Sequence, residues 1–127
     1  VNGAIELFNY LKEHNIPFTI ASASIKENID FFVKTFNLNR WFDLNKIVYD
    51  DGSHNNKISM FNKAAKLIDV DINECIIFED SKSGIGFAKE VSAGMVVGIG
   101  NNFNDLISYG ADCCINDFTE FECEKYL

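Results

Sequence analysis

Apolar residues follow two alternating patterns along this chain. Five segments place them three or four positions apart, which predicts amphipathic helices near residues 4–11, 25–36, 61–68, 85–91 and 102–109. Short apolar runs predict buried strands at 18–22, 46–50, 75–79, 95–100 and 112–116. Apolar strands separated by helices are typical of a parallel sheet that is covered on both faces. The pattern therefore predicts an α/β fold with three layers: helices, sheet and helices.

The composition fits one such domain and limits what it binds. At 127 residues, with 47% hydrophobic residues and 12 phenylalanines, the chain can bury a core, and we do not expect disorder. Its formal net charge of −8 argues against binding to nucleic acid or to an anionic membrane surface. No apolar run approaches the ~18 residues of a membrane span, and no signal peptide is visible, so we expect a cytoplasmic protein. The four cysteines lack zinc-type spacing, and we expect reduced, partly buried thiols.

Polar side chains stand where two of the predicted strands end. Ser22 ends the first predicted strand, and Glu79 and Asp80 end the third. In an open parallel sheet, ligands bind outside the carboxyl ends of the strands, and a helix that follows such an end can bind an anion with its first N–H groups. Lys57, which precedes the third predicted helix, can reach the same place. We therefore expect these four side chains to face one crevice.

The residue types in this crevice fit phosphoryl transfer. We expect the Ser22 hydroxyl and the backbone amides that follow it, Ala23 among them, to hold phosphate oxygens, and Lys57 to neutralise phosphate charge. Glu79 and Asp80 offer hard oxygen ligands, which suit Mg²⁺ when a phosphate supplies further ligands. Catalysis of phosphoryl transfer depends mostly on such positioning and charge neutralisation.

Each of these features also has a purely structural interpretation. Ser24 and Glu27 have the spacing of a capping box, in which Ser24 would only cap the second helix. Glu79 and Asp80 precede a helix, where acids compensate the helix dipole. The aspartates of "DDG" (50–52) are typical of a turn rather than of a metal site. A single lysine is most often a solvated charge. The residue types alone leave both interpretations open.

The order and spacing of the motifs resemble those of a known family. "TIASAS" (19–24), a lysine beyond "YDDG", and "ECIIFEDSKSGIGFAKEVSAGMVVGIG" (74–100) together look like the haloacid dehalogenase (HAD) superfamily, and more narrowly its β-phosphoglucomutase-like phosphatases and mutases. The resemblance extends from about Asn2 to Asp117. It departs at the third motif, because Lys57 is followed by isoleucine, serine and methionine where the family has a K-P-x-P-D run.

The resemblance implies a fold, an activity and residue functions. The fold is a Rossmann-like parallel sheet with helices on both faces, and the activity is Mg²⁺-dependent phosphoryl transfer on a small phosphorylated metabolite, such as a sugar phosphate, through an aspartyl-phosphate intermediate. Glu79 and Asp80 would hold the Mg²⁺, with Asp80 the stronger candidate for direct coordination. Ser22, Ala23 and Lys57 would bind the phosphate.

The catalytic motif of that family is not found in this chain. Its nucleophile is the first aspartate of a D-x-D motif that follows the first strand, whereas the D-x-D present here, Asp69-Val70-Asp71, follows the helical run "FNKAAKLI". We do not assign that motif the catalytic function, because it lacks the structural context. The family's substrate-selecting helical cap is also missing. We therefore interpret residues 1–127 as a partial HAD-like core domain that is inactive alone.

Two other functional classes stay open. A catalytically dead HAD-like domain would act as a binding or regulatory module, and a D-x-D-G-[TV] motif encoded upstream would argue against it. A receiver-like or flavodoxin-like domain shares the layered architecture. A receiver, however, would need an early acidic pair at the end of a strand.

The resemblance also implies a gap in the sheet. The strand that carries the missing motif lies between the strand that ends at Ser22 and the strand that ends at Glu79. Without it, two rows of backbone groups lack partners, which is costly when they are buried and favours association when they are exposed. We expect a preceding segment or another chain to fill this gap, or the two strands to close up and pair directly.

Overall fold

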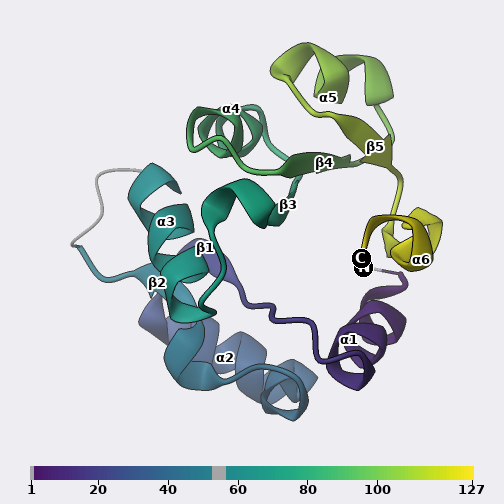
Figure 1. Cartoon of the computed structure of the whole chain (residues 1–127). Coiled ribbons are helices and arrows are strands. Elements are labelled where there is room, and N and C mark those ends of the chain that lie inside the picture. The colour runs from purple at the N-terminus through teal and green to yellow at the C-terminus, as the bar shows by residue number, and fades with distance from the viewer. Residues whose placement is uncertain (1, 53–56) are drawn as a thin grey trace.

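Helices and strands alternate along the chain as the apolar pattern predicts, and the paired strands are all parallel (Figure 1). The computed structural model describes residues 2–52 and 57–127. The elements are α1 (Ala4–Glu13), β1 (Ala21–Ile25), α2 (Lys26–Phe36), β2 (Val48–Asp50), α3 (Lys57–Leu67), β3 (Ile76–Glu79), α4 (Lys82–Glu90), β4 (Met95–Ile99), α5 (Phe103–Tyr109), β5 (Cys113–Ile115) and α6 (Cys123–Tyr126).

Helices cover both faces of the strands, which confirms the three-layer α/β fold. The side chains of Val96 and Val97 in β4 are both fully buried. Successive side chains of a strand point to opposite faces, so β4 is covered on both sides. Val96 packs with residues of α3, α4 and α5, whereas Val97 packs with α1 and with Phe121 near the C-terminus. Two apolar clusters on either side of β4 therefore form the core.

The first strand begins later in the chain than the sequence predicts. The apolar run indicates residues 18–22, but β1 spans Ala21–Ile25. Its ladder partner β2 is only three residues long and starts opposite Ala21, where the carbonyl of Ile20 accepts a hydrogen bond from the Val48 backbone N–H at 2.8 Å. The position of β2 thus sets where pairing starts. Ser22 consequently lies inside β1 and not at its end, so that part of the prediction is wrong.

Two predictions about local hydrogen bonds had opposite outcomes. Asp50 Oδ1 accepts a hydrogen bond from the Gly52 backbone N–H at 3.0 Å, and Gly52 has a φ of +85°, which confirms a turn at "DDG". The capping box at Ser24 is wrong, because Ile25 precedes the first turn of α2 and no side chain caps that end. The Ser24 backbone N–H donates instead to Ser22 Oγ at 3.1 Å. Strand β1 continues to Ile25, so Ser24 is still part of the strand where a cap would be needed.

The four cysteines are free thiols, and all are partly buried, as predicted. Burial raises the pKa of each of these thiols, because the thiolate loses solvation in an apolar environment. In the segments that the structure describes, no helix combines the length and apolar character needed to cross a membrane.

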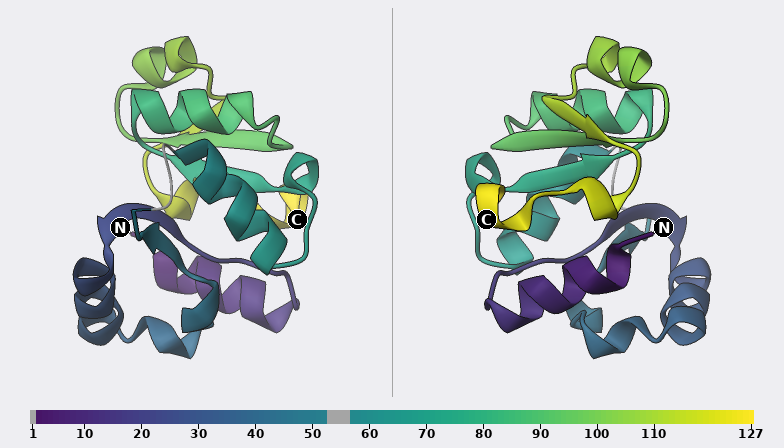
Figure 2. Two further views of the ribbon diagram at one scale, coloured as in Figure 1. Left: turned by 90° about the vertical axis from the view of Figure 1, so that its left-hand side faces the viewer. Right: turned by 90° about the vertical axis from the view of Figure 1, so that its right-hand side faces the viewer.

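The strands form two separate sheets. Strand β1 pairs with β2, and β3, β4 and β5 pair in that order. Within the described residues, β1 and β3 do not pair with each other, so the two strands have not closed up. Figure 2 shows the two halves from the sides, with β3, β4 and β5 in one half and the extended segment that leads from α1 to β1 in the other. Each half-sheet therefore has a strand edge that faces the other half.

An apolar cavity of about 480 Å³ lies between the two halves. Two of its walls are the segments 16–21 and 74–79, which run side by side with the gap between them. Leu7 and Leu11 of α1 line one of the remaining sides, and Ala64 and Ala65 of α3 line the other. We call this cavity the interstrand slot. Strand-like walls on two sides and helices on the other two are the surroundings of a central strand in a three-layer fold.

Candidate functional site

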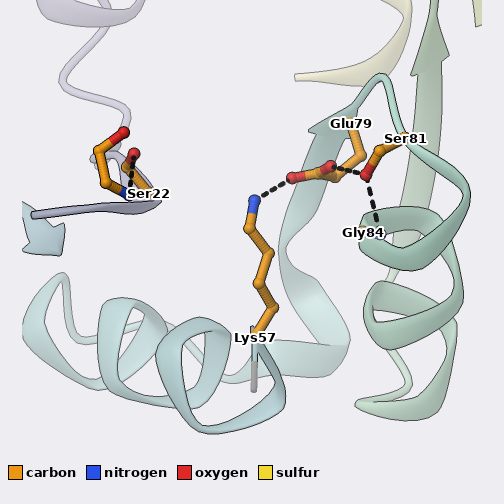
Figure 3. A network of polar contacts seen from close by, with 6 residues as sticks. Ser22, Lys57, Glu79, Ser81 and Gly84 are labelled. Carbon is orange, nitrogen blue, oxygen red and sulfur yellow. Dashed lines mark hydrogen bonds and ion pairs between the residues drawn. The ribbon is translucent and has the colours of Figure 1, made fainter. Parts of the chain in front are cut away.

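Charged and polar side chains meet where β3 ends. Lys57 is the first residue of α3, Glu79 is the last residue of β3, and Ser81 immediately precedes α4. Figure 3 shows the Lys57 side chain extending from α3 to the Glu79 carboxylate, with Ser81 beside it. The sequence prediction that Lys57 reaches the carboxyl end of this strand is thus consistent with the structure. Helix α3 and the junction of β3 with α4, which are distant in sequence, thus contribute to one polar cluster.

Glu79 is held at both of its carboxylate oxygens. Oε1 lies 2.6 Å from Lys57 Nζ in an ion pair, and Oε2 accepts a hydrogen bond from Ser81 Oγ at 3.3 Å. Among the described residues, Glu79 is the buried charged side chain, with 9% of its surface exposed. A buried carboxylate is tolerated only with such compensation, because burial removes its hydration. The ion pair and the hydroxyl together therefore keep the charge at the end of the core strand.

Two residues at the start of α4, Ser81 and Gly84, lie directly beside this carboxylate. Ser81 Oγ also accepts a hydrogen bond from the Gly84 backbone N–H at 3.0 Å, so Ser81 is the N-cap of α4. A Cβ atom on Gly84 would lie only 1.9 Å from Glu79 Oε2. Position 84 therefore needs glycine for space, and the missing side chain leaves room for the Glu79 carboxylate. Neither Ser81 nor Gly84 was predicted as part of the site, although a serine immediately before an amphipathic helix is itself a capping signal.

Lys57 is held by a second contact besides the ion pair. Its Nζ lies 5.5 Å from the centre of the Phe61 ring, one turn further along α3. The Lys57 side chain is 22% exposed, so part of it is accessible to solvent. Its direct partner in this structure is a carboxylate. The predicted phosphate contact stays a prediction.

The remaining predicted phosphate-binding and metal-binding residues lie close to the chain surface. Ser22 is half-buried in β1, and Ala23 and Asp80 are exposed. Figure 3 shows Ser22 on one side of the Lys57 ammonium and Glu79 on the other. The ion pair thus brings Lys57 and Glu79 together, whereas a shared crevice with Ser22 stays a prediction. Their function in binding phosphate or metal stays a prediction.

Asp69 and Asp71 lie at the opposite end of β3 from Glu79. Asp69 follows α3 with a φ of +59°, and Asp71 immediately precedes the 3₁₀ turn that leads into β3. They therefore belong to a helix-to-strand connection at the amino end of that strand. The D-x-D motif therefore lacks the position after a strand that the family's catalytic motif has.

The acidic pair can supply part of a magnesium site but not a complete one. In the described ranges 2–52 and 57–127, no three His, Cys, Asp or Glu side chains come together as a metal cage. Mg²⁺ commonly takes one or two carboxylates and completes its coordination with water and substrate phosphate. Oxygen donors at Asp80 and Glu79 fit that requirement in kind. Further ligands would come from groups outside this chain.

The close contact between Gly84 and the Glu79 carboxylate leads to a prediction with a matched control. Gly84→Ala should lower the free energy of unfolding by about 1–3 kcal/mol, because the new methyl group displaces a buried, hydrogen-bonded carboxylate. Gly86→Ala, in the same helix, meets no atom within 4 Å and should be neutral or stabilise by up to ~1 kcal/mol through helix propensity. Urea unfolding midpoints would measure both. Equal effects of the two substitutions would show that Glu79 does not occupy the space above Gly84.

Comparisons with known proteins agree with this arrangement. A family model described as haloacid dehalogenase-like hydrolase matches residues 1–92. A HAD hydrolase of family IA, variant 3, from Entamoeba histolytica has a solved structure that is 38% identical, with a TM-score of 0.93 over 98% of this chain. A hydrolase from Pseudomonas syringae is 27% identical with a TM-score of 0.78 over 93% of the chain. A protein from Thermotoga maritima that is described as a putative β-phosphoglucomutase shares the fold. It is 22% identical, with a TM-score of 0.81 over 91% of this chain.

The chain corresponds to only part of each of these proteins. It covers 58% of the Entamoeba histolytica chain, 57% of the Pseudomonas syringae chain and 55% of the Thermotoga maritima chain. The matching part includes both half-sheets and the polar cluster at the end of β3, since it extends over nearly all of the present sequence. On the family match and the likeness in sequence and structure, the chain belongs to the haloacid dehalogenase-like hydrolases, with a β-phosphoglucomutase-like core.

Proposed function

We propose that this chain is the phosphate-binding and metal-binding part of a HAD-type enzyme that transfers a phosphoryl group from a small phosphorylated metabolite. The observation that carries the proposal is the Lys57–Glu79 ion pair of 2.6 Å at the carboxyl end of β3. Ligands in open parallel sheets bind at this edge. A partly exposed ammonium fixed at that edge suits a phosphate dianion. A phosphatase and a phosphomutase of the β-phosphoglucomutase type both fit this description.

Each of the predicted site residues has a distinct task in this proposal. The Lys57 ammonium neutralises charge on the phosphate oxygens, and the Ser22 hydroxyl with the Ala23 backbone amide holds further oxygens. Asp80 offers an exposed carboxylate to Mg²⁺, with Glu79 next to it in sequence. A bound Mg²⁺ would withdraw negative charge from the phosphate. The protein groups thus orient the phosphate and reduce its charge.

The interstrand slot is where the rest of the site would enter. A strand that occupied the slot in parallel with β3 would end beside Glu79, because Glu79 lines the slot as the last residue of β3. An acidic group at the end of such a strand would lie next to Lys57. We propose that a segment preceding residue 1, or another chain, supplies this strand together with the acceptor carboxylate. The related structures are consistent with this, since the chain covers little more than half of their length.

The choice of substrate class rests on likeness to β-phosphoglucomutases. The Thermotoga maritima structure and a β-phosphoglucomutase from Clostridium difficile both share this fold, at 22% and 23% identity. At that level of identity only the fold is shared with certainty, so a sugar phosphate is our proposal for the substrate. The net charge of −8 favours a small phosphate ester over a polyanion such as nucleic acid.

The proposal predicts a specific loss at Asp80. In the protein as its gene encodes it, Asp80→Asn should reduce phosphatase activity by about 10²-fold or more with little change in stability, because an exposed oxygen ligand becomes a neutral amide. Asp105→Asn, at an exposed position of α5, is the control and should leave activity unchanged. Steady-state rates across a Mg²⁺ titration would measure the effect. An Asp80→Asn variant with wild-type rate and Mg²⁺ dependence would refute the metal site.

The chain of 127 residues alone should not hydrolyse phosphate esters. It has positioning groups, but the carboxylate beside Lys57 among its described residues is Glu79, which is held in the ion pair, and no carboxylate of the chain is assigned as the phosphoryl acceptor. A generic phosphomonoester assay on the isolated chain would measure this. Hydrolysis that disappears in Asp69→Asn would show that the D-x-D motif after α3 is catalytic after all, and hydrolysis that persists in that variant would point to another nucleophile.

A further inference from the structure

We infer that the exposed side of α2 is an interface at which two copies of this protein associate about a two-fold axis, with their α2 helices antiparallel. The interface lies on the outer surface of the half that contains β1 and β2. It does not depend on the proposed function, because the dimer and a phosphate site at the end of β3 can each exist without the other.

Helix α2 has apolar side chains that the rest of the chain leaves open. Ile29 and Val33 pack toward the core. The three phenylalanines of the helix do not, since Phe31 is 64%, Phe32 41% and Phe36 58% exposed. The rings of Phe31 and Phe32 lie with their centres 6.0 Å apart and so contact each other. Large apolar side chains that gather on one exposed face are typical of an interaction surface.

This exposed side of α2 carries no charge. At 3.6 residues per turn, the three phenylalanines share an arc of about 140° with two uncharged polar residues, Asn28 and Thr35. The charged residues of the helix all lie outside this arc, and they are Lys26, Glu27, Asp30 and Lys34. Two lysines and two acids cancel, so the helix is neutral in a chain with a net charge of −8. Two chains that repel each other overall therefore meet here with the least repulsion.

The position of α2 leaves this face accessible even when the interstrand slot is filled. Among the described residues, none of those that line the slot belongs to α2. Figure 2 shows the helix, coloured blue, at the outer side of its half, with β3, β4 and β5 in the other half. A strand that entered the slot would therefore not cover the phenylalanines of α2.

The chemistry of the face favours a second copy over a different protein. Association with a different protein is commonly steered by complementary charge, which would require a patch of one sign on this chain. The arc of α2 offers none. In an isologous dimer both copies present the same patch, so the patch has to complement itself. An uncharged apolar surface does so.

The charges beside the arc set the orientation of the two helices. Lys26 and Asp30 pair with each other within the helix at 2.9 Å, whereas no ion pair of Glu27 or Lys34 is found in the part of the chain that the structure describes. An antiparallel arrangement with its axis between Asp30 and Phe31 places Glu27 at the height of the partner's Lys34, and it does so twice by symmetry. A parallel arrangement would instead place like charges opposite each other, which is unfavourable.

The size of the face predicts a weak dimer. The exposed fractions of Phe31, Phe32 and Phe36 amount to about one and a half whole side chains, or roughly 300 Å² of each copy. A standard interface buries about 800 Å² of each partner. Since interfaces of that standard size have dissociation constants from micromolar to picomolar, we expect about 1 µM or weaker for this smaller one.

Sedimentation velocity on the protein as its gene encodes it tests the inference. Between about 0.1 and 500 µM, wild type should change from monomer to dimer. Phe31→Glu should raise the dissociation constant about 100-fold or more, because two carboxylates would meet near the axis. Ile107→Glu is the control, since Ile107 is 52% exposed on α5, and it should leave the constant unchanged. Unchanged urea midpoints would show that both variants are folded.

A charge exchange tests the antiparallel orientation. Glu27→Lys alone and Lys34→Glu alone should each raise the dissociation constant about tenfold, because two attractive pairs become repulsive. The two changes together should restore it to within about threefold of wild type. Within one copy Glu27 and Lys34 lie two turns apart, so such compensation reports a contact between copies.

Three results would overturn the inference. One is a protein that stays monomeric at every concentration, whether the face is open or covered by another part of the encoded protein. Another is a dimer that Phe31→Glu does not weaken, because its interface would then lie elsewhere. The third is a dimer in which the exchanged charges do not compensate, since the helices would then not be antiparallel in the inferred register.

Discussion

Helix α3 joins two half-sheets that share no strand pairing within the described residues. Its Met60 and Ala64 pack with Val48 of β2, and its Phe61 packs in the cluster that includes Ile85 of α4. Its first residue, Lys57, reaches across to Glu79 at the end of β3 in an ion pair of 2.6 Å. The apolar face of this helix thus holds the halves together at their core, and the ion pair holds them at the edge where ligands bind. The candidate site and the interstrand slot both depend on this helix.

The slot and the polar cluster have a common physical origin. A strand edge that faces the slot presents backbone groups that need partners, and the apolar walls need side chains to fill them. Glu79 lies at one end of the slot, so any strand that satisfies both needs in parallel with β3 ends near Lys57. A single strand in the slot would therefore both fill the core and complete the site. Stability and activity should rise together when the strand is present.

Much of the fold could be predicted from the sequence, because periodicity reports burial directly. The runs that became β3 and β4 were placed to within one residue, since both strands are short apolar segments bounded by polar turns. Strand β1 was misplaced because its position depends on pairing with β2. The apolar pattern of one segment carries no information about the strand with which it pairs. The approach of Lys57 to the carboxyl end of β3 was predicted from the sequence, but its ion pair with Glu79 was not. That pairing depends on how α3 and β3 pack, which spacing along one chain cannot show.

The width of the gap between the two half-sheets tests the account most directly. In a chain whose four native cysteines are replaced by serine, cysteines at Ala21 and Ile77, which pack against the same cluster from the two walls of the slot, should not form a disulfide on mild oxidation. A slot one strand wide separates them by about 10 Å, beyond the ~7 Å that a disulfide can span. Cysteines at Ile76 and Met95, which are direct partners in β3 and β4, are the control and should form one. Rapid, complete cross-linking of the Ala21–Ile77 pair in a monomer would contradict the account, because it would mean that the two strands lie side by side with no place for a third.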